Sequence, residues 1–154
     1  VAISDNAFDS CLNLAQLTVP AKVSSIGMDA FSNNTSLVKV RFTKNSQSPE
    51  ELIIGQQCFE GCTKLTDILF TAHIKRLETG LFQGCTALKT VSVPSNITYI
   101  GVEVFDGCSS LTSLTFDRPN GWKTVNGYAR PVLDDPKQNV TYFTNTYVSY
   151  YWTR

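Results

Sequence analysis

The sequence lacks an excess of charge of either sign, and this absence narrows the classes of partner. Its 154 residues include thirteen Lys or Arg residues and thirteen Asp or Glu residues, which gives a formal net charge of zero. Nucleic-acid backbones and anionic lipid surfaces attract proteins through a positive field, which a balanced chain does not supply. We therefore expect no nucleic-acid partner.

The sequence also lacks any apolar run of the roughly 20 residues that a membrane-spanning helix needs. The basic-then-apolar pattern of a signal peptide is missing as well. The chain has no initiator Met and opens at Ile3 within a repeat unit, which suggests a piece of a longer protein. We expect a soluble monomer that does not insert into a membrane, with any signal peptide and anchor outside the given segment.

Histidine, the residue most often used in catalysis and in zinc sites, is scarce. His73 is the single histidine, so a zinc site would depend on cysteines, and no motif links His73 to a Ser or Cys nucleophile. Cys58 and Cys62 stand four positions apart, whereas the thioredoxin type of redox motif has two intervening residues. No phosphate-binding loop of the form Gly-x-x-x-x-Gly-Lys is present. We therefore predict no enzyme activity, no cofactor and no metal site.

The five cysteines are an odd number, so they cannot all pair within one chain. Four of them occupy the same repeat position, which in the second copy is Asn34: Cys11, Cys62, Cys85 and Cys108. Disulfide frameworks are typical of chains too small to bury a core, which this chain is not. We predict that these four thiols are reduced, buried and metal-free, and that they share with Asn34 a role in packing and hydrogen bonding.

A repeat organises most of the chain. Five Phe residues fix its register, spaced 23, 28, 23 and 23 residues apart: Phe8, Phe31, Phe59, Phe82 and Phe105. A Leu stands six residues after each Phe, and apolar residues nine and eleven after it alternate as in a half-buried strand. The predicted strands are 14–19, 37–42, 65–70, 88–93 and 111–116. Because a period in this range is typical of a solenoid, we expect these strands to form one parallel sheet.

A second apolar pair, such as Ile97 with Ile100, predicts a short strand on the opposite wall. A single helical turn is expected around each Phe. It ends at a residue that in most copies tolerates left-handed backbone: Ser10, Asn33, Gly61, Gly84 or Gly107. The 28-residue interval carries five extra residues within a polar run at 43–51, which predicts a surface loop.

Segments 88–94, 97–101 and 104–108 resemble the BspA-like class of leucine-rich repeats. The resemblance covers residues 1–117 in five registered copies. Asn34 in place of Cys, and Cys58 in place of a small residue, are mild departures. The resemblance implies a solenoid that occurs on surface or secreted proteins of host-associated bacteria and some protozoa, several of them linked to adhesion.

The predicted fold is therefore a β-rich α/β solenoid: a right-handed leucine-rich repeat stack with short helical turns, a parallel sheet and a C-terminal α+β cap. We assign 1–117 to five repeats of about 23 residues and 118–154 to a cap packed on the last repeat. Within 118–154, Asn126-Gly127 predicts a hairpin and Asp135-Pro136 the start of a helix. The aromatic residues fit a cap, with a platform for sugar stacking or a partner as the alternative: Trp122, Tyr142, Phe143, Tyr150, Tyr151 and Trp152.

Two classes of function fit the sequence. The first is a non-catalytic extracellular or cell-surface module for recognition of a protein or a glycan, for instance in adhesion to a host. The second is a structural spacer within a larger surface protein. Outward strand positions favour the first, because charged and apolar residues gather beside the insertion. The candidate binding residues are Lys39, Arg41, Asp67 and Leu69.

Overall fold

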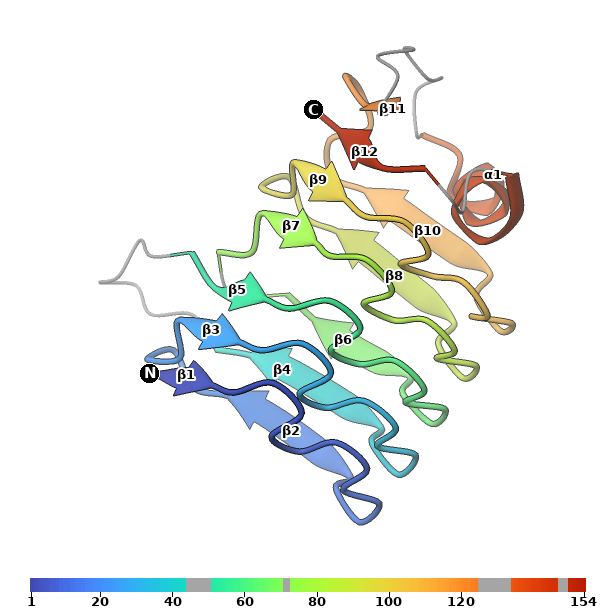
Figure 1. Cartoon of the computed structure of the whole chain (residues 1–154). Helices are drawn as coiled ribbons and strands as arrows, with labels where there is room; N and C mark the ends of the chain where they lie inside the picture. The colour runs from blue at the N-terminus through green and yellow to red at the C-terminus, as the bar shows by residue number, and fades with distance from the viewer. Residues whose placement is uncertain (44–50, 71–72, 125–133, 147–149) are drawn as a thin grey trace.

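A computed structural model describes residues 1–43, 51–70, 73–124, 134–146 and 150–154. These residues form a stack of about five turns, and each turn contributes one strand to each of two walls (Figure 1). The N-terminus lies at one end of the stack, and the short helix α1 lies at the other. The predicted leucine-rich repeat solenoid is confirmed.

The longer strands form the first wall: β2 (Gln16–Val19), β4 (Lys39–Phe42), β6 (Asp67–Leu69), β8 (Thr90–Val93) and β10 (Ser113–Phe116). β2, β4 and β6 pair in parallel, as do β8 and β10, and equivalent residues of successive repeats stand opposite each other. The predicted parallel direction and register are confirmed. Among the described residues no pairing joins β6 to β8, so the expected single sheet consists of two adjoining pieces.

The shorter strands form the opposite wall: β1 (Ala2–Ile3), β3 (Ser25–Ile26), β5 (Ile53–Ile54), β7 (Arg76–Leu77) and β9 (Tyr99–Ile100). β1, β3 and β5 pair in parallel, and β7 pairs with β9 in the same way. Successive turns approach closely just after these strands. A Cβ atom at Gly101 would lie 2.5 Å from the backbone nitrogen of Thr79, which explains the Gly at this position.

The segment around each Phe is a series of turns, and this detail differs from the expected helical turn. The residue two positions after each Phe has a positive φ, from 54° at Ser10 to 70° at Gly84. The residue two positions before each Phe has one too, although only one of the five is Gly: Asn6, Asp29, Gln57, Gly80 and Glu103. Left-handed residues on both sides of the Phe interrupt a right-handed helix. Backbone groups bond to the next turn instead, as where Phe82 N–H donates to the Val104 carbonyl at 3.0 Å.

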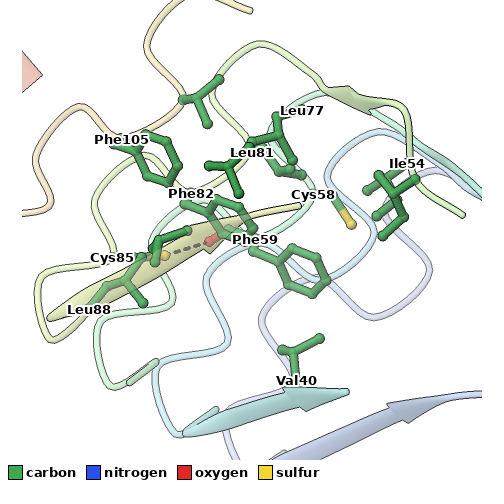
Figure 2. Packing of buried hydrophobic residues seen from close by; sticks show 14 of the residues in the cluster. Val40, Ile54, Cys58, Phe59, Leu77, Leu81, Phe82, Cys85, Leu88 and Phe105 are labelled. Carbon is green, nitrogen blue, oxygen red and sulfur yellow. Dashed lines mark hydrogen bonds between the residues drawn. The ribbon is translucent and has the colours of Figure 1, made fainter. Parts of the chain in front are cut away.

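The core between the walls contains a row of stacked Phe rings, one from each turn. Ring centroids of consecutive members are 5.2, 5.8, 5.9 and 5.9 Å apart. Figure 2 shows Phe59, Phe82 and Phe105 of this row among buried Leu, Ile and Val side chains. Phe42 and Phe70 stack on each other at 6.0 Å and extend the aromatic core toward the first wall. Burial is therefore distributed along the stack, as expected for a solenoid.

The cysteine column links consecutive turns. Each of its three buried thiols donates a hydrogen bond to the carbonyl of the Phe one turn earlier, at 3.3 Å from Cys62, 3.2 Å from Cys85 and 3.1 Å from Cys108. The bond from Cys85 to Phe59 is drawn in Figure 2. Asn34 performs the same task, because its side-chain amide donates to the Phe8 carbonyl at 2.8 Å. The packing and hydrogen-bonding role predicted for this column is confirmed, and all five cysteines are free of disulfides.

Cys11 departs from the prediction, because it is exposed. It lies in the first turn, where Phe8 is 45% exposed. Burial of this column requires a preceding turn that covers the thiol and offers a carbonyl, and the described residues include no turn before that of Cys11. The repeat pattern alone treated the five positions as equivalent, which is why it was wrong here.

The predicted helix is present near the C-terminus. α1 (Pro136–Thr141) begins after Asp135, whose carboxylate accepts hydrogen bonds from the backbone N–H groups of Lys137 at 2.9 Å and Gln138 at 3.0 Å. A π-helical segment, η1 (Tyr142–Thr146), continues it. An N-cap Asp followed by Pro at the first helical position therefore located the start of the helix correctly.

The last strand changes the direction of pairing. β12 (Trp152–Thr153) lies between β9 and β11 (Lys123–Thr124) and pairs antiparallel with both (Figure 1). The parallel ladder of the second wall therefore stops at β9. β11 is held at the edge by β12 and has no pairing with β9 among the described residues.

Three aromatic side chains of the C-terminal segment are buried at the end of the stack: Trp122, Phe143 and Trp152. The Phe143 ring lies 5.7 Å from that of Phe116 and 6.4 Å from that of Phe105, both in the fifth turn. Tyr150 and Tyr151 remain 36% and 39% exposed. The segment thus covers the core of the fifth turn, whereas the domain division at residue 117 stays a prediction.

Two predictions fall outside the described residues. These are the Asn126-Gly127 hairpin and the interior of the insertion at 44–50. Within the described ranges, no helix combines the length and the apolar character needed to cross a membrane.

Candidate functional site

The first wall presents every second side chain to solvent, because successive residues of a strand point to opposite faces. On β4, Val40 and Phe42 are buried, while Lys39 and Arg41 face outward. The parallel register then places outward residues of neighbouring turns side by side. Two outward rows result: Gln16, Lys39 and Asp67 in the first, and Thr18, Arg41 and Leu69 in the second.

Lys39 and Asp67 form an ion pair between β4 and β6. The Lys39 Nζ atom lies 3.1 Å from the Asp67 Oδ2 atom, and the two side chains are 33% and 50% exposed. Water screens a pair this exposed, so it contributes at most about 1 kcal/mol to stability. Both groups keep hydrogen-bonding capacity toward solvent, and the pair fixes a donor and an acceptor in known positions.

The second row brings a cation beside an apolar side chain. Arg41 stands opposite Leu69, and Arg41 has no ion pair among the described residues. Leu69 is 47% exposed, and Val38, immediately before β4, is 41% exposed. The structure therefore brings the four predicted residues together on adjacent strands. Their role in binding stays a prediction.

Farther along the stack, the first wall has no charged or apolar side chains at the outward positions of its described strands. Its outward positions on β8 and β10 carry only hydroxyl side chains: Thr90, Ser92, Ser113 and Thr115. Charged and apolar groups of the outward rows are thus confined to β4 and β6. This local concentration distinguishes the candidate site from the rest of the first wall.

The ends of the insertion attach to both walls. Thr43 follows β4, and both its backbone N–H and its hydroxyl donate to the Val19 carbonyl, at 3.0 and 2.9 Å. Glu51, at the other end, forms an ion pair with Lys75 at 3.3 Å, close to the second wall. The insertion therefore leaves the first wall two residues after Arg41, at the edge of the candidate site.

A polar and aromatic cluster on the second wall was not predicted. The Arg76 guanidinium lies 3.7 Å from the centre of the Tyr99 ring and pairs with Glu78, and the hydrogen bond to Glu78 raises the pKa of Arg76. Tyr151 lies 6.0 Å from Tyr99. Arg76 and Tyr99 occupy equivalent positions of consecutive repeats, so comparing the outward column of the short strands would have found this pair.

The arrangement does not favour thiol or metal chemistry. Burial raises the pKa of the Cys62 and Cys108 thiols to about 12, so these groups stay protonated at neutral pH. In the described ranges, no group of three or more His, Cys, Asp or Glu side chains is placed to hold a metal ion. Among the described residues of the first wall, no exposed nucleophile is paired with a base.

Comparison with protein families finds a match over residues 1–129 to the BspA type leucine rich repeat region, in six copies. The chain belongs to this BspA-type leucine-rich repeat family. The match has one copy more than the five Phe-registered units, and it extends past residue 117 into the segment assigned to the cap. A search of curated protein sequences found no match.

Solved structures of bacterial leucine-rich repeat proteins share the fold. A T. pallidum leucine-rich repeat protein is 27% identical to this BspA-type chain, with a TM-score of 0.66. The match covers 74% of this chain and 51% of the T. pallidum protein. A leucine-rich repeat protein from Eubacterium ventriosum is 25% identical with a TM-score of 0.50, covering 69% of this chain and 34% of its own. The pneumococcal vaccine antigen PcpA is 17% identical to this chain, with a TM-score of 0.58. The match covers 90% of this chain and 42% of PcpA. This chain spans about half the length of the T. pallidum protein.

Proposed function

We propose that this leucine-rich repeat chain is a non-catalytic recognition module, outside the cell or at the cell surface, that binds a protein or a glycan through its first wall. The binding surface is the patch formed by Lys39, Arg41, Asp67 and Leu69. Adhesion to a host is the process that such a module would serve. The module acts as a monomer and has no nucleic-acid partner.

The observation that carries this proposal is the register of β4 with β6. It sets Lys39 opposite Asp67 and Arg41 opposite Leu69, with 3.1 Å between the charged atoms of the first pair. A donor, an acceptor, a second cation and an apolar surface then share one small area. Protein interfaces combine an apolar centre with surrounding polar groups in this way.

The fold protects most of the thiols from an oxidising environment. Four of the five are buried, so an oxidant reaches them only when the chain unfolds, whereas Cys11 is exposed. The family to which the chain belongs supports a location outside the cell or at its surface.

The experiment replaces Lys39, Arg41 and Asp67 together with Ser and measures attachment of the purified protein to immobilised host matrix proteins and glycans. A matched control replaces Lys64, Lys89 and Asp134, which are also exposed, so two cations and one anion are again lost. We expect the first variant to lose attachment and the control to keep it. Both variants are expected to keep the circular dichroism spectrum and a melting temperature close to that of the parent protein, because exposed ion pairs contribute little.

Full attachment by the first variant would refute the assignment of the patch. Absence of attachment in the parent protein to every matrix component tested would favour the spacer instead. A further variant, Leu69→Ser, tests the apolar centre alone and is expected to weaken attachment while the ion pair remains.

A further inference from the structure

The balanced net charge of the chain conceals an asymmetry between its two parts. Residues 1–117 contain eight basic and eleven acidic residues, whereas residues 118–154 contain five basic and two acidic residues. The C-terminal part therefore has a formal charge of +3 and the repeats a charge of −3. Anionic groups are attracted to the C-terminal end of the stack and repelled along the rest.

Two cations of this part line one hollow. It lies just after β10, where the chain leaves the last strand of the first wall, and its lining residues are Asp117, Arg118, Pro119, Asn120, Gly121 and Arg154. Arg118 and Arg154 come from segments distant in the sequence and meet only because β12 folds back beside β9. In the described ranges, neither guanidinium forms an ion pair.

The backbone that positions these two residues is fixed by hydrogen bonds. Asp117 N–H donates to the Val93 carbonyl at 3.0 Å, and the indole N–H of buried Trp122 donates to the Arg118 carbonyl at 3.1 Å. Arg154 N–H donates to the Thr98 carbonyl at 3.1 Å. At Gly121, no atom of the described residues lies within 4 Å of the position that a Cβ would occupy. Both sides of the hollow are thus held before any ligand arrives.

Arg118 and Arg154 line the same hollow. Partial burial, and then the charge of Arg118, lower the pKa of Arg154. Arg154 remains charged at neutral pH, since an Arg side chain has an unperturbed pKa above 12. Two like charges at one hollow repel each other, and an anion between them would relieve that repulsion.

We propose that the hollow between Arg118 and Arg154 is an oxyanion-binding site that receives a sulfate ester or a carboxylate of an acidic ligand. Guanidinium groups present several N–H donors in a planar fork, which suits the oxygen atoms of either group. Asp117 also lines the hollow and offsets one of the two positive charges. Asp117 thereby limits the affinity for anions. This site is separate from the Lys39 patch and does not depend on that patch being functional.

Titration with sodium sulfate, and separately with sodium acetate, followed by ¹H–¹⁵N NMR at low ionic strength, tests the site in the whole chain. We expect saturable shifts of the backbone amide signals of residues 118–121 and of Arg154. The probe that binds with the higher affinity, sulfate or acetate, identifies the oxyanion. Removing one charge-assisted hydrogen bond through Arg118→Gln or Arg154→Gln is expected to weaken binding by about tenfold or more.

Two further variants separate this site from general charge effects. Asp117→Asn removes the competing carboxylate and is expected to tighten binding, whereas Lys89→Gln removes an exposed cation elsewhere and is expected to change nothing. Melting curves check the fold of each variant. Shifts that do not saturate, that are largest away from the hollow, or that persist unchanged in Arg118→Gln and Arg154→Gln would overturn the proposal. Weaker binding in Asp117→Asn would also contradict it.

Discussion

The row of Phe rings predicts a steep dependence of stability on position in the stack. Phe82 is 0% exposed and lies between Phe59 and Phe105, at 5.9 Å from each, with Phe70 at its edge. Phe8 occupies the equivalent position in the first turn and is 45% exposed; among the described residues, its one ring neighbour is Phe31, at 5.2 Å. The same substitution at these two positions therefore removes very different amounts of packing.

The magnitudes follow from burial. Phe82→Ala removes a fully buried side chain and leaves a cavity, which costs about 3–5 kcal/mol. Phe8→Ala loses only about half of the roughly 1.5–3 kcal/mol of full burial, or about 0.8–1.5 kcal/mol. Since domains of this size are stable by about 5–15 kcal/mol, the first change is a large fraction of the total and the second is not.

Urea denaturation followed by circular dichroism and by Trp fluorescence measures both effects. The two Trp residues, Trp122 and Trp152, lie in the C-terminal segment, so fluorescence reports that end and circular dichroism reports the whole chain. A central loss weakens coupling between neighbouring turns, so Phe82→Ala is expected to separate the two transitions. Equal free-energy losses for Phe82→Ala and Phe8→Ala would refute this reasoning, because burial would then not decide the contribution of each ring.

Further predictions concern the cysteine column, the cap and the thiols. The Asn34 side-chain amide donates to the Phe8 and Phe31 carbonyls, both at 2.8 Å, and Asn34→Asp would place a buried carboxylate facing them. We expect the free energy of unfolding, measured by urea denaturation, to fall by about 3–5 kcal/mol at pH 7. It should partly recover at pH 4. Phe143→Ala is expected to lower the free energy of unfolding by about 3–5 kcal/mol. Truncation after Asp117 is expected to cause aggregation visible by light scattering. A soluble, monomeric truncated chain would contradict the cap. Thiol titration of folded protein at neutral pH is expected to label one cysteine, Cys11, and all five after denaturation. Because burial raises the pKa of Cys62 and Cys108 to about 12, stability measured by urea is expected to fall as the pH rises from the pKa of an unfolded thiol toward 12, and a flat profile would contradict this.

The walls of the solenoid could be predicted because the same pattern of apolar residues occurs in every repeat. Leu88, Val91 and Val93 stand at offsets shared by all copies, and period-two alternation identifies a strand with one buried face. In-register stacking then follows from the shared offset of each strand from its own Phe. It places Lys39, eight positions after Phe31, beside Asp67, eight positions after Phe59, without knowledge of the structure. The candidate site was therefore predictable in its position, though not in its ion-pair geometry.

Features that depend on contacts between distant segments were not predictable. The left-handed residues before each Phe include Gln57 and Glu103, residue types that rarely adopt positive φ, so residue preference did not mark the whole column. Exposure of Cys11 depends on its place at the end of the stack. The pairing of Trp152 with Ile100 joins segments far apart in sequence, and nothing local specifies that such a strand runs antiparallel. The hollow between Arg118 and Arg154 depends on that pairing.

Because β12 pairs antiparallel, the number of repeats can change among the internal turns but not at the end that β12 covers. Each internal turn meets only its two neighbours, so a 23-residue unit can be duplicated or deleted among the internal turns without altering what Trp152 covers. Every such event would lengthen or shorten the first wall by one strand spacing, about 4.8 Å. The number of repeats therefore sets the length of the first wall, while β12 keeps the same antiparallel contact with the last parallel strand of the second wall.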